Sequence, residues 1–418
     1  MNIQIRNARL MNEGSPVDFY IRNGQISGPF EGPFDHIYDI GGAALFPGLI
    51  DAHCHLRDPG IEYKEDIESG TKSAAKGGFT SVCPMPNTNP VCDNASVVQS
   101  IIAKSKSVGH ANVFPIGAAS KGLISRELAE MGLMKDAGIV AVSNDGLPIE
   151  SADLMRKVLE YASAFRLVVM DHCEEKSLSD GVMNEGALST RMGLRGIPTL
   201  AENIMISRDL LIAEYLDLPV HICHVSNRAG IQLIRDAKAR GVKVTAETCP
   251  HYFSLTEEAC KGFDTNAKMS PPLRTEDDRQ AVIEGLSDGT IDIIVTDHAP
   301  HHQDDKQIEF SLASNGIVGF ETAFSLGFTY LVKTGKLTLN RLIDCMAKGP
   351  SDLFDLGRGT LMTGAPADIT CFDLENAFVF DKDKMLSKSR NTPFHDQELF
   401  GKCILTIMGG RTTYEELR

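Results

Sequence analysis

The chain has 418 residues, with 56 acidic and 41 basic side chains and a formal net charge of −15. This length exceeds what one hydrophobic core usually serves, so we expect one large domain and a smaller one. The acidic balance argues against nucleic acid or an anionic membrane as partner, because no basic face compensates for it. No apolar run approaches the ~20 residues that span a bilayer, and the first residues lack a signal-peptide pattern, so we expect a cytoplasmic protein.

The first segments, IQIRNARL (3–10) and DFYIRNGQI (18–26), alternate polar and apolar residues and predict two strands split by a turn. Eight short apolar runs follow, most of them ending at a polar or glycine-rich turn: 45–55, 79–84, 112–117, 138–143, 166–172, 218–224, 242–248 and 291–297. Amphipathic segments such as 151–164 and 228–240 separate several of these runs and predict helices. Eight strands alternating with helices over about 250 residues predict an α/β fold with a (β/α)8 TIM-like barrel.

The last part of the chain again has the pattern of short strands joined by glycine turns. These strands are expected in ADITCFD (367–373), NAFVF (376–380) and GKCILTIMGGRTTY (401–414). Because both ends of the chain read as β-structure, we expect them to pair. We therefore predict two domains: residues 1–47 and 356–418 form a small β-sandwich, and residues 48–355 form the barrel.

Metal-capable side chains fall at the ends of the predicted barrel strands. His53 and His55 are two residues apart on the first strand, so both should point to the same face. The later strands end on, or are followed by, four more such residues: Asp145, His172, His224 and Asp297. A lone histidine at a strand end is more often a hydrogen-bonded core residue. Four histidines and two aspartates at one rim are unlikely to occur by chance. Since barrel enzymes carry their chemistry at this rim, the pattern predicts a divalent-metal site, and imidazole suits zinc.

Other metal-capable side chains are expected to be structural. The ten cysteines form no CxxC pair, which in a cytoplasmic chain predicts reduced, buried thiols. Cys54 and Cys223 lie beside histidines, so a ligand role is conceivable, but strand alternation should turn Cys54 away from its neighbours. The odd separation of His221 and His224 should likewise place His221 on the opposite face.

A family resemblance is carried by motifs along nearly the whole chain. DAHCHLRDPG (51–60) resembles the DxHxHxRDPG motif of class I dihydroorotases, in the amidohydrolase superfamily. Seven later segments are similar to that family's motifs, in the same order: PMPNTNP (84–90), NDGLP (144–148), DHCE (171–174), CHVSN (223–227), ETCPHY (247–252), PPLR (271–274) and GTIDIIVTDHAPH (289–301). The arginine two residues after the second histidine, together with DHAPH at the eighth strand, is a specific combination.

The resemblance implies two zinc sites that share a bridging carboxylate: His53, His55 and Asp297 for one, His172 and His224 for the other, and Asp145 between them. Many superfamily members have a carboxylated lysine at the bridging position. The NDG segment (144–146) is instead similar to the aspartate-bridged branch of the family. Because aspartate reaches less far than a carboxylated lysine, we expect one or two Zn²⁺ per subunit, with a weaker second site.

The resemblance further implies a zinc-dependent cyclic amidohydrolase with dihydroorotase activity. The reaction is the reversible cyclisation of N-carbamoyl-L-aspartate to L-dihydroorotate, in de novo pyrimidine (UMP) biosynthesis. Asp297 would take the ureido proton in ring closure and return it to the ring nitrogen in hydrolysis. Arg57, Asn87 and His301 match the positions that bind the α-carboxylate, for which an arginine fork is suited. The structural alternatives are that Arg57 forms a salt bridge with Asp58 or with another acidic residue at the barrel mouth, and that Asn87 is a turn residue.

Two other functions remain open at this stage. Ser270 precedes PPLR where the family commonly has asparagine, and this serine is similar to hydantoinases and dihydropyrimidinases. Those relatives lack the arginine after HxH and use a lysine bridge, which favours dihydroorotase. The second alternative is a non-catalytic homologue that scaffolds aspartate transcarbamoylase, although every ligand position is filled here. A homodimer and a complex with aspartate transcarbamoylase are the protein partners that the resemblance leaves open.

Overall fold

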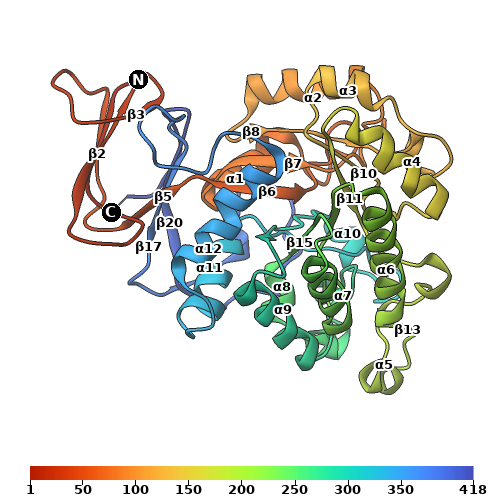
Figure 1. Ribbon diagram of the computed structural model, residues 1–418. Helices are drawn as coiled ribbons and strands as arrows, with labels where there is room; N and C mark the ends of the chain where they lie inside the picture. Colours follow the sequence, from red (N-terminus) through yellow and green to blue (C-terminus); the bar gives the residue numbers. More distant parts are fainter. Residues whose placement is uncertain (418) are drawn as a thin grey trace.

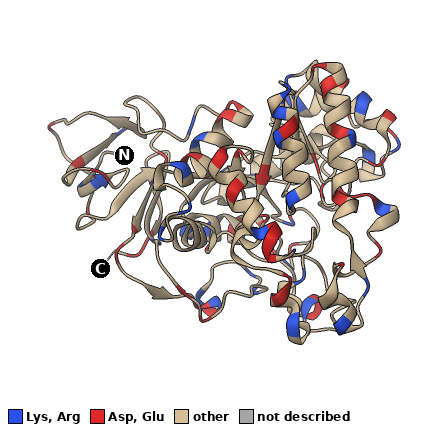
Figure 2. Ribbon diagram, turned by 60° about the horizontal axis from the view of Figure 1, so that its bottom comes forward, with Lys and Arg blue, Asp and Glu red and all other residues tan. Residues whose placement is uncertain are grey.

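The computed structural model describes residues 1–417. Figure 1 shows a barrel of strands ringed by helices and, beside it, a smaller all-β unit that holds both chain ends. Basic and acidic residues are interspersed on the outer helices rather than gathered by sign (Figure 2), and several form pairs one helical turn apart, such as Lys157 with Asp153. Within the described residues, no helix is both long and apolar enough to cross a membrane.

The barrel strands follow one another in parallel pairs. They are β6 (Leu49–Cys54), β7 (Phe79–Pro84), β8 (Asn112–Val113), β9 (Ile116–Ala118), β10 (Ala141–Ser143), β11 (Val168–Asp171), β14 (Val220–Ile222), β15 (Val244–Thr248) and β16 (Ile293–Ile294). Pairing runs through β6-β7-β8 and through β9-β10-β11-β14-β15-β16. A bridge between Cys54 and His298 joins the end of the series to its beginning. The predicted α/β fold with a TIM-like barrel is confirmed.

Helices connect these strands and cover the barrel. Their bounds are α1 (Ile67–Lys76), α2 (Ala95–Val108), α3 (Met131–Ala137), α4 (Ala152–Ser163), α5 (Ala187–Met192), α6 (Thr199–Leu216), α7 (Arg228–Ala239), α8 (Pro250–Ser254), α9 (Glu276–Asp288), α10 (Gln303–Lys306), α11 (Ala323–Gly327), α12 (Leu339–Ile343) and α13 (Gly349–Phe354). Both predicted amphipathic helices are present as α4 and α7. The side chain of Ser151 caps α4 and that of Asn227 caps α7, each accepting from a backbone N–H of the first turn. A short pair, β12 (Met183–Asn184) and β13 (Gly196–Ile197), flanks α5.

The small domain is one folded sheet made from both ends of the chain. Its strands are β1 (Ile3–Leu10), β2 (Val17–Arg22), β3 (Gln25–Ser27), β4 (His36–Asp39), β5 (Ala44–Pro47), β17 (Ile369–Asp373), β20 (Lys402–Met408) and β21 (Arg411–Glu415). Strand β1 pairs with β2 and β4 along its first half and with β5 at its end, so it belongs to both halves of the sheet. The two halves enclose a separate apolar core that includes Ile5, Ile21, Leu45, Ile369 and Leu405. The predicted β-sandwich from both chain ends is thereby confirmed.

Two predicted strands are each divided in the structure. The run 45–55 contributes β5 to the small sheet and β6 to the barrel, with Gly48 between them. A Cβ at Gly48 would collide with the side chain of Thr80, so glycine lets the chain pass close against β7. The run 112–117 splits into β8 and β9 around Pro115, because proline has no N–H to donate to a sheet ladder.

The segment between β17 and β20 does not lie in the small sheet, contrary to the expectation for NAFVF. Within it, β18 (Phe378–Val379) pairs with β19 (Glu398–Leu399), and Phe380 and Phe394 join the apolar core of the barrel. The side-chain amide of Asn391 donates to the carbonyl oxygens of Ala299 and Gly316, each at 3.0 Å. We propose the domain division 1–47 and 356–418 against 48–355, with this segment as an excursion of the small domain across the barrel.

Candidate active site

The six predicted metal ligands lie together, buried at the ends of the barrel strands, and Asp145 is at their centre. Its Oδ2 lies 3.2 Å from Nε2 of His53 and 3.5 Å from Nε2 of His55. Its Oδ1 lies 3.2 Å from Nε2 of His224 and 3.4 Å from Nδ1 of His172. One carboxylate oxygen therefore faces the two histidines at the end of β6, and the other faces the histidines that follow β11 and β14.

Asp297 completes the group on the β6 side. Its Oδ1 lies 3.1 Å from Nε2 of His55 and 3.8 Å from Nε2 of His53, and these three residues form one cluster able to hold a cation. A second such cluster consists of His53, Asp145 and His224. The two clusters share His53, so the geometry suits either one ion or two adjacent ions.

The backbone helps to aim these side chains. Asp297 has a φ of +44° and His224 a φ of +32°, in the left-handed region that residues other than glycine rarely adopt. Both residues stand just beyond the end of a strand, where the chain turns out of the barrel. Such backbone conformations cost on the order of 1–3 kcal/mol each and persist where the surroundings fix them, which is typical of functional sites.

The electrostatics of the cavity fit a cation. Burial alone would raise the pKa of Asp145, but His53 and the contacts with His172 and His224 hold it well below its usual range. Burial opposes ionisation of Asp297 too, yet His55 and His53 keep its pKa below the ordinary value. Nε2 of His53 is fully buried and has no hydrogen-bond partner among residues 1–417. Such a buried polar atom calls for a partner, and four imidazoles with two carboxylates are a donor set that suits zinc.

Arg57 is half-buried and lies near Asp297 and Asp145. Its Nε donates to the carbonyl oxygen of Pro300 at 3.3 Å, and its terminal nitrogens make no hydrogen bond or ion pair within the described chain. Asp58, the salt-bridge partner considered for Arg57, instead contacts Nζ of Lys104 at 2.6 Å. The fork of Arg57 is therefore free to receive a carboxylate.

Asn87 and His301 each contact other residues of the protein. Oδ1 of Asn87 lies 2.9 Å from Nδ1 of His55, which leaves the amide nitrogen of Asn87 to donate elsewhere. Both ring nitrogens of His301 have partners: Nδ1 lies 3.3 Å from Nζ of Lys64, and Nε2 lies 2.7 Å from the carbonyl oxygen of Asn315. Burial and the neighbouring cations, first Arg57 and then Lys64, lower the pKa of His301 to about 2, so its ring is neutral.

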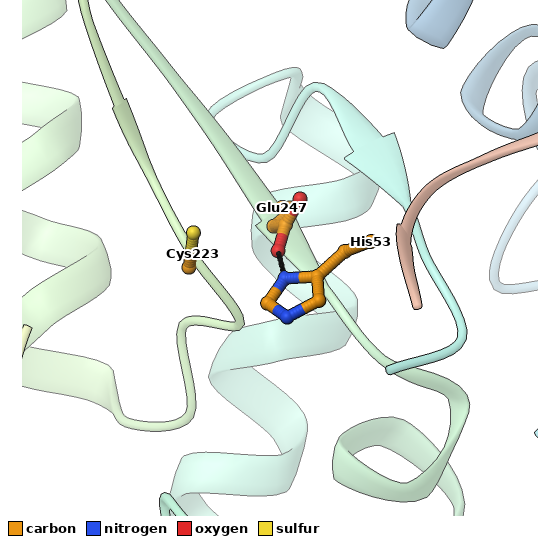
Figure 3. Close-up of side chains that lie close together, drawn as sticks. All are labelled: His53, Cys223 and Glu247. Carbon is orange, nitrogen blue, oxygen red and sulfur yellow. Dashed lines mark hydrogen bonds and ion pairs between the residues drawn. The ribbon is translucent and has the colours of Figure 1, made fainter. Parts of the chain in front are cut away.

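Sequence reasoning missed Glu247, which lies directly behind His53 (Figure 3). Its Oε1 is 2.6 Å from Nδ1 of His53 and its Oε2 is 3.0 Å from Nε2 of His221. The expectation that His221 faces away from the side of His224 was wrong. Side chains alternate between faces only within a regular strand, and His224 lies beyond the end of β14 with a positive φ. The sequence feature that could have indicated Glu247 is its place as the only charged residue in the strand segment VTAET.

Cys223 also lies close to His53 and Glu247, and Figure 3 shows it beside the two. Burial and the charge of Glu247 raise the pKa of its thiol well above the usual value. His53, Cys223 and Glu247 form a further cluster able to hold a cation, on the side of His53 that faces Glu247 rather than Asp145. Cys54 is buried and belongs to none of the cation-holding clusters among the described residues.

Comparison with known proteins decides the family. A family model described as "Dihydro-orotase-like" matches residues 42–230. A dihydroorotase of Acetivibrio thermocellus is 58% identical over 376 residues, which cover 90% of this chain and 88% of that protein. A dihydroorotase of Syntrophotalea carbinolica is 50% identical over 422 residues, 99% of each chain. The chain belongs to the dihydroorotase family.

Solved structures of related enzymes share the fold of this dihydroorotase-family chain. The L-hydantoinase of Arthrobacter aurescens superposes with a TM-score of 0.89 at 25% identity, over 100% of this chain and 96% of that one. The dihydropyrimidinase of Brevibacillus agri has a TM-score of 0.86 at 22% identity, over 100% and 96% of the two chains. Because identity to dihydroorotases reaches 58%, the comparisons favour a cyclic amidohydrolase of the dihydroorotase type over the hydantoinase alternative.

Proposed function

We propose that this chain interconverts N-carbamoyl-L-aspartate and L-dihydroorotate with one or two zinc ions held by Asp145 and the five proposed ligands around it. The reaction belongs to pyrimidine biosynthesis, and we place it in the cytoplasm. The observation that carries the proposal is the position of Asp145, whose two oxygens face two separate groups of histidines 3.2–3.5 Å away. A carboxylate so placed suits the bridging role between paired ions.

The ligand sets follow the two sides of Asp145. His53, His55 and Asp297 would hold the first ion, and His172 and His224 the second. When bound, the metal supplies a hydroxide-generating, carbonyl-polarising Lewis acid at neutral pH. We propose a weaker second ion, because only two residues besides the short bridge would hold it.

Asp297 would carry the proton in both directions. Its carboxylate is held in the ionised form and lies at the mouth of the barrel. In ring opening it takes a proton from the attacking water and gives it to the ring nitrogen as the C–N bond breaks. In ring closure it takes the ureido proton as the new C–N bond forms. One oxygen of the substrate's side-chain carboxyl group then leaves as water, with the proton that Asp297 passes to it and a second proton taken from solvent.

The α-carboxylate that the ring retains would lie against Arg57 and Asn87. The open guanidinium can form two parallel hydrogen bonds to a carboxylate, and the amide nitrogen of Asn87 can add a third. His301 would join by exchanging its contact with Lys64 or with Asn315 for one with the substrate. In this arrangement the cationic Arg57 would neutralise the charge of the substrate carboxylate, and the neutral His301 would orient that carboxylate by a hydrogen bond.

The decisive experiment is turnover by purified protein. L-dihydroorotate should be opened to N-carbamoyl-L-aspartate, activity should disappear after treatment with a metal chelator, and added zinc should restore it. Dihydrouracil and hydantoin serve as comparison substrates. Turnover of either one without turnover of dihydroorotate would refute the proposal.

Two protein partners accompany this function as proposals: a second copy of the chain and aspartate transcarbamoylase. Sedimentation of the purified protein tests the first, since a homodimer has twice the mass of the 45.5 kDa chain. Co-elution with the transcarbamoylase of the same organism tests the second. Monomeric behaviour or separate elution would exclude the corresponding partner.

A further inference from the structure

Glu247 is a fully buried residue on β15, and within residues 1–417 the hydrogen bonds of its carboxylate are all with histidines. Nδ1 of His53 lies 2.6 Å from its Oε1 and Nε2 of His221 lies 3.0 Å from its Oε2. The backbone N–H of His224 donates to Oε1 at 3.3 Å. In the part of the chain that the structure describes, no lysine or arginine pairs with it. Burying a carboxylate without such a partner is costly, so the surrounding N–H groups must stabilise it.

The carboxylate fixes where the imidazole hydrogens lie. An ionised carboxylate only accepts hydrogen bonds, so the ring nitrogens that face Glu247 carry hydrogen: Nδ1 of His53 and Nε2 of His221. Nε2 of a neutral His53 then keeps its lone pair, and this atom lies 3.2 Å from Asp145, buried and without a hydrogen bond. Figure 3 shows the ring with one nitrogen on Glu247 and the other directed away from it.

The chain of contacts continues behind Glu247 to the wall of the barrel. Nδ1 of His221 lies 2.7 Å from Oγ1 of Thr245, whose hydroxyl can donate to it. His221 and Thr245 are register partners on the adjacent strands β14 and β15, and Glu247 is two residues further on the same face as Thr245. The sheet register therefore holds a continuous series, Thr245–His221–Glu247–His53, that ends at the candidate metal position.

We propose that Glu247 and His221 are positioning residues for the metal ligand His53: Glu247 fixes its tautomer and ring orientation, and His221 holds Glu247. The proposal rests on the metal-dependent function proposed above. A hydrogen-bonded carboxylate behind a histidine ligand also makes that ligand more basic, and loss of such a partner typically weakens metal binding by 10–100-fold.

The test measures metal binding rather than turnover. The variants are Glu247→Gln, His221→Gln and His221→Leu, with Glu321→Gln as the matched control. Glu321 is another buried glutamate, with a side chain 2% exposed, but its partners are Lys76, Ser73 and the backbone N–H of Leu386, outside the site. Zinc affinity is measured by competition with a chromophoric chelator, the Co²⁺-loaded proteins are compared by visible absorption, and the metal-free proteins by thermal unfolding.

We expect Glu247→Gln to bind zinc about 10–100-fold more weakly and to shift the Co²⁺ spectrum, while Glu321→Gln matches the wild type in both. His221→Gln keeps an N–H for Glu247 and should retain more affinity than His221→Leu. Wild-type affinity and spectrum in Glu247→Gln would overturn the proposal. If that variant does not fold, equal zinc affinities of the two His221 variants would overturn it. Failure of the wild type to bind zinc would refute the proposed function instead.

Discussion

Asn87 lies behind His55 as Glu247 lies behind His53: its Oδ1 is 2.9 Å from Nδ1 of His55. The Nε2 atom of His55 is thereby presented to Asp297, 3.1 Å away. The same amide keeps two hydrogens on its nitrogen, so one side chain can orient a metal ligand and contact the substrate. Different substitutions of Asn87 can therefore test its contact with His55 and its contact with the substrate separately.

Asn87→Asp should keep zinc and lose substrate affinity. An aspartate still offers an oxygen to Nδ1 of His55, but its negative charge repels the substrate carboxylate, so KM for L-dihydroorotate should rise at least about tenfold. Asn87→Ala should lose both properties. Zinc content by elemental analysis and steady-state kinetics distinguish the two variants. An unchanged KM in Asn87→Asp would exclude Asn87 from the substrate site.

Arg57→Lys should impair substrate binding while leaving zinc content near that of the wild type. The planar fork is replaced by a point charge that cannot make two parallel hydrogen bonds, which we expect to raise KM about 10–100-fold. Kinetics with L-dihydroorotate and zinc analysis of the same preparation provide the measurement. A parallel loss of zinc would assign Arg57 to the structure of the metal site.

Asp297→Asn should reduce kcat by about 10²–10⁴-fold, because the amide cannot accept and return a proton. Asparagine keeps an oxygen close to His55, so zinc content should fall less than kcat does. Single-turnover kinetics on zinc-loaded protein measure the chemical step directly. Wild-type rates in this variant would eliminate Asp297 as the proton carrier.

Lys306 predicts a pH dependence of stability. Its buried ammonium donates to the carbonyl oxygens of Ser314 and Gly316, yet burial lowers its pKa from 10.5 to about 7. Between those values the unfolded chain binds a proton that the folded chain lacks, so stability rises with pH from about 7 to about 10. The rise is at most about 1.4 kcal/mol per pH unit.

Lys306→Met removes this titration, so the unfolding temperature of the wild type should increase relative to the variant as pH rises through that window. Scanning calorimetry at pH 6.5, 8 and 9.5 (roughly the window set by the shift) measures the difference. Lys384→Met is the control, because the Lys384 side chain is 80% exposed and should give a constant difference. A constant difference for Lys306→Met as well would contradict the prediction.

Much of the fold could be predicted from the sequence because burial on both faces of a parallel strand leaves a continuous apolar run. The run 79–84 is β7 without change. The runs 45–55 and 112–117 are each divided because their halves pair with different strands. This pairing could not be predicted from the sequence alone. The position of NAFVF against the barrel could not be predicted for the same reason, since its alternating pattern is compatible with either sheet.

The candidate site divides in a similar way. The six proposed metal ligands could be predicted because each lies at or just after the end of a strand. The carboxyl ends of all barrel strands meet at the same rim. Glu247 could not, because its contact with His53 arises from the closure of the barrel, across residues 194 positions apart. Strand alternation failed to relate His221 to His224 because His224 lies beyond β14 with a positive φ, which residue type does not reveal.

The excursion of the small domain across the barrel connects the C-terminal part of the chain to the loop that carries His301. Oδ1 of Asn391 accepts the backbone N–H of His301 at 3.1 Å, while its amide donates to Ala299 and Gly316 on either side of that loop. The loop that carries His301 is therefore held by a residue 90 positions further along the chain. A fragment that ends at residue 355 would keep every proposed zinc ligand and would lack Asn391, which fixes the backbone of this loop.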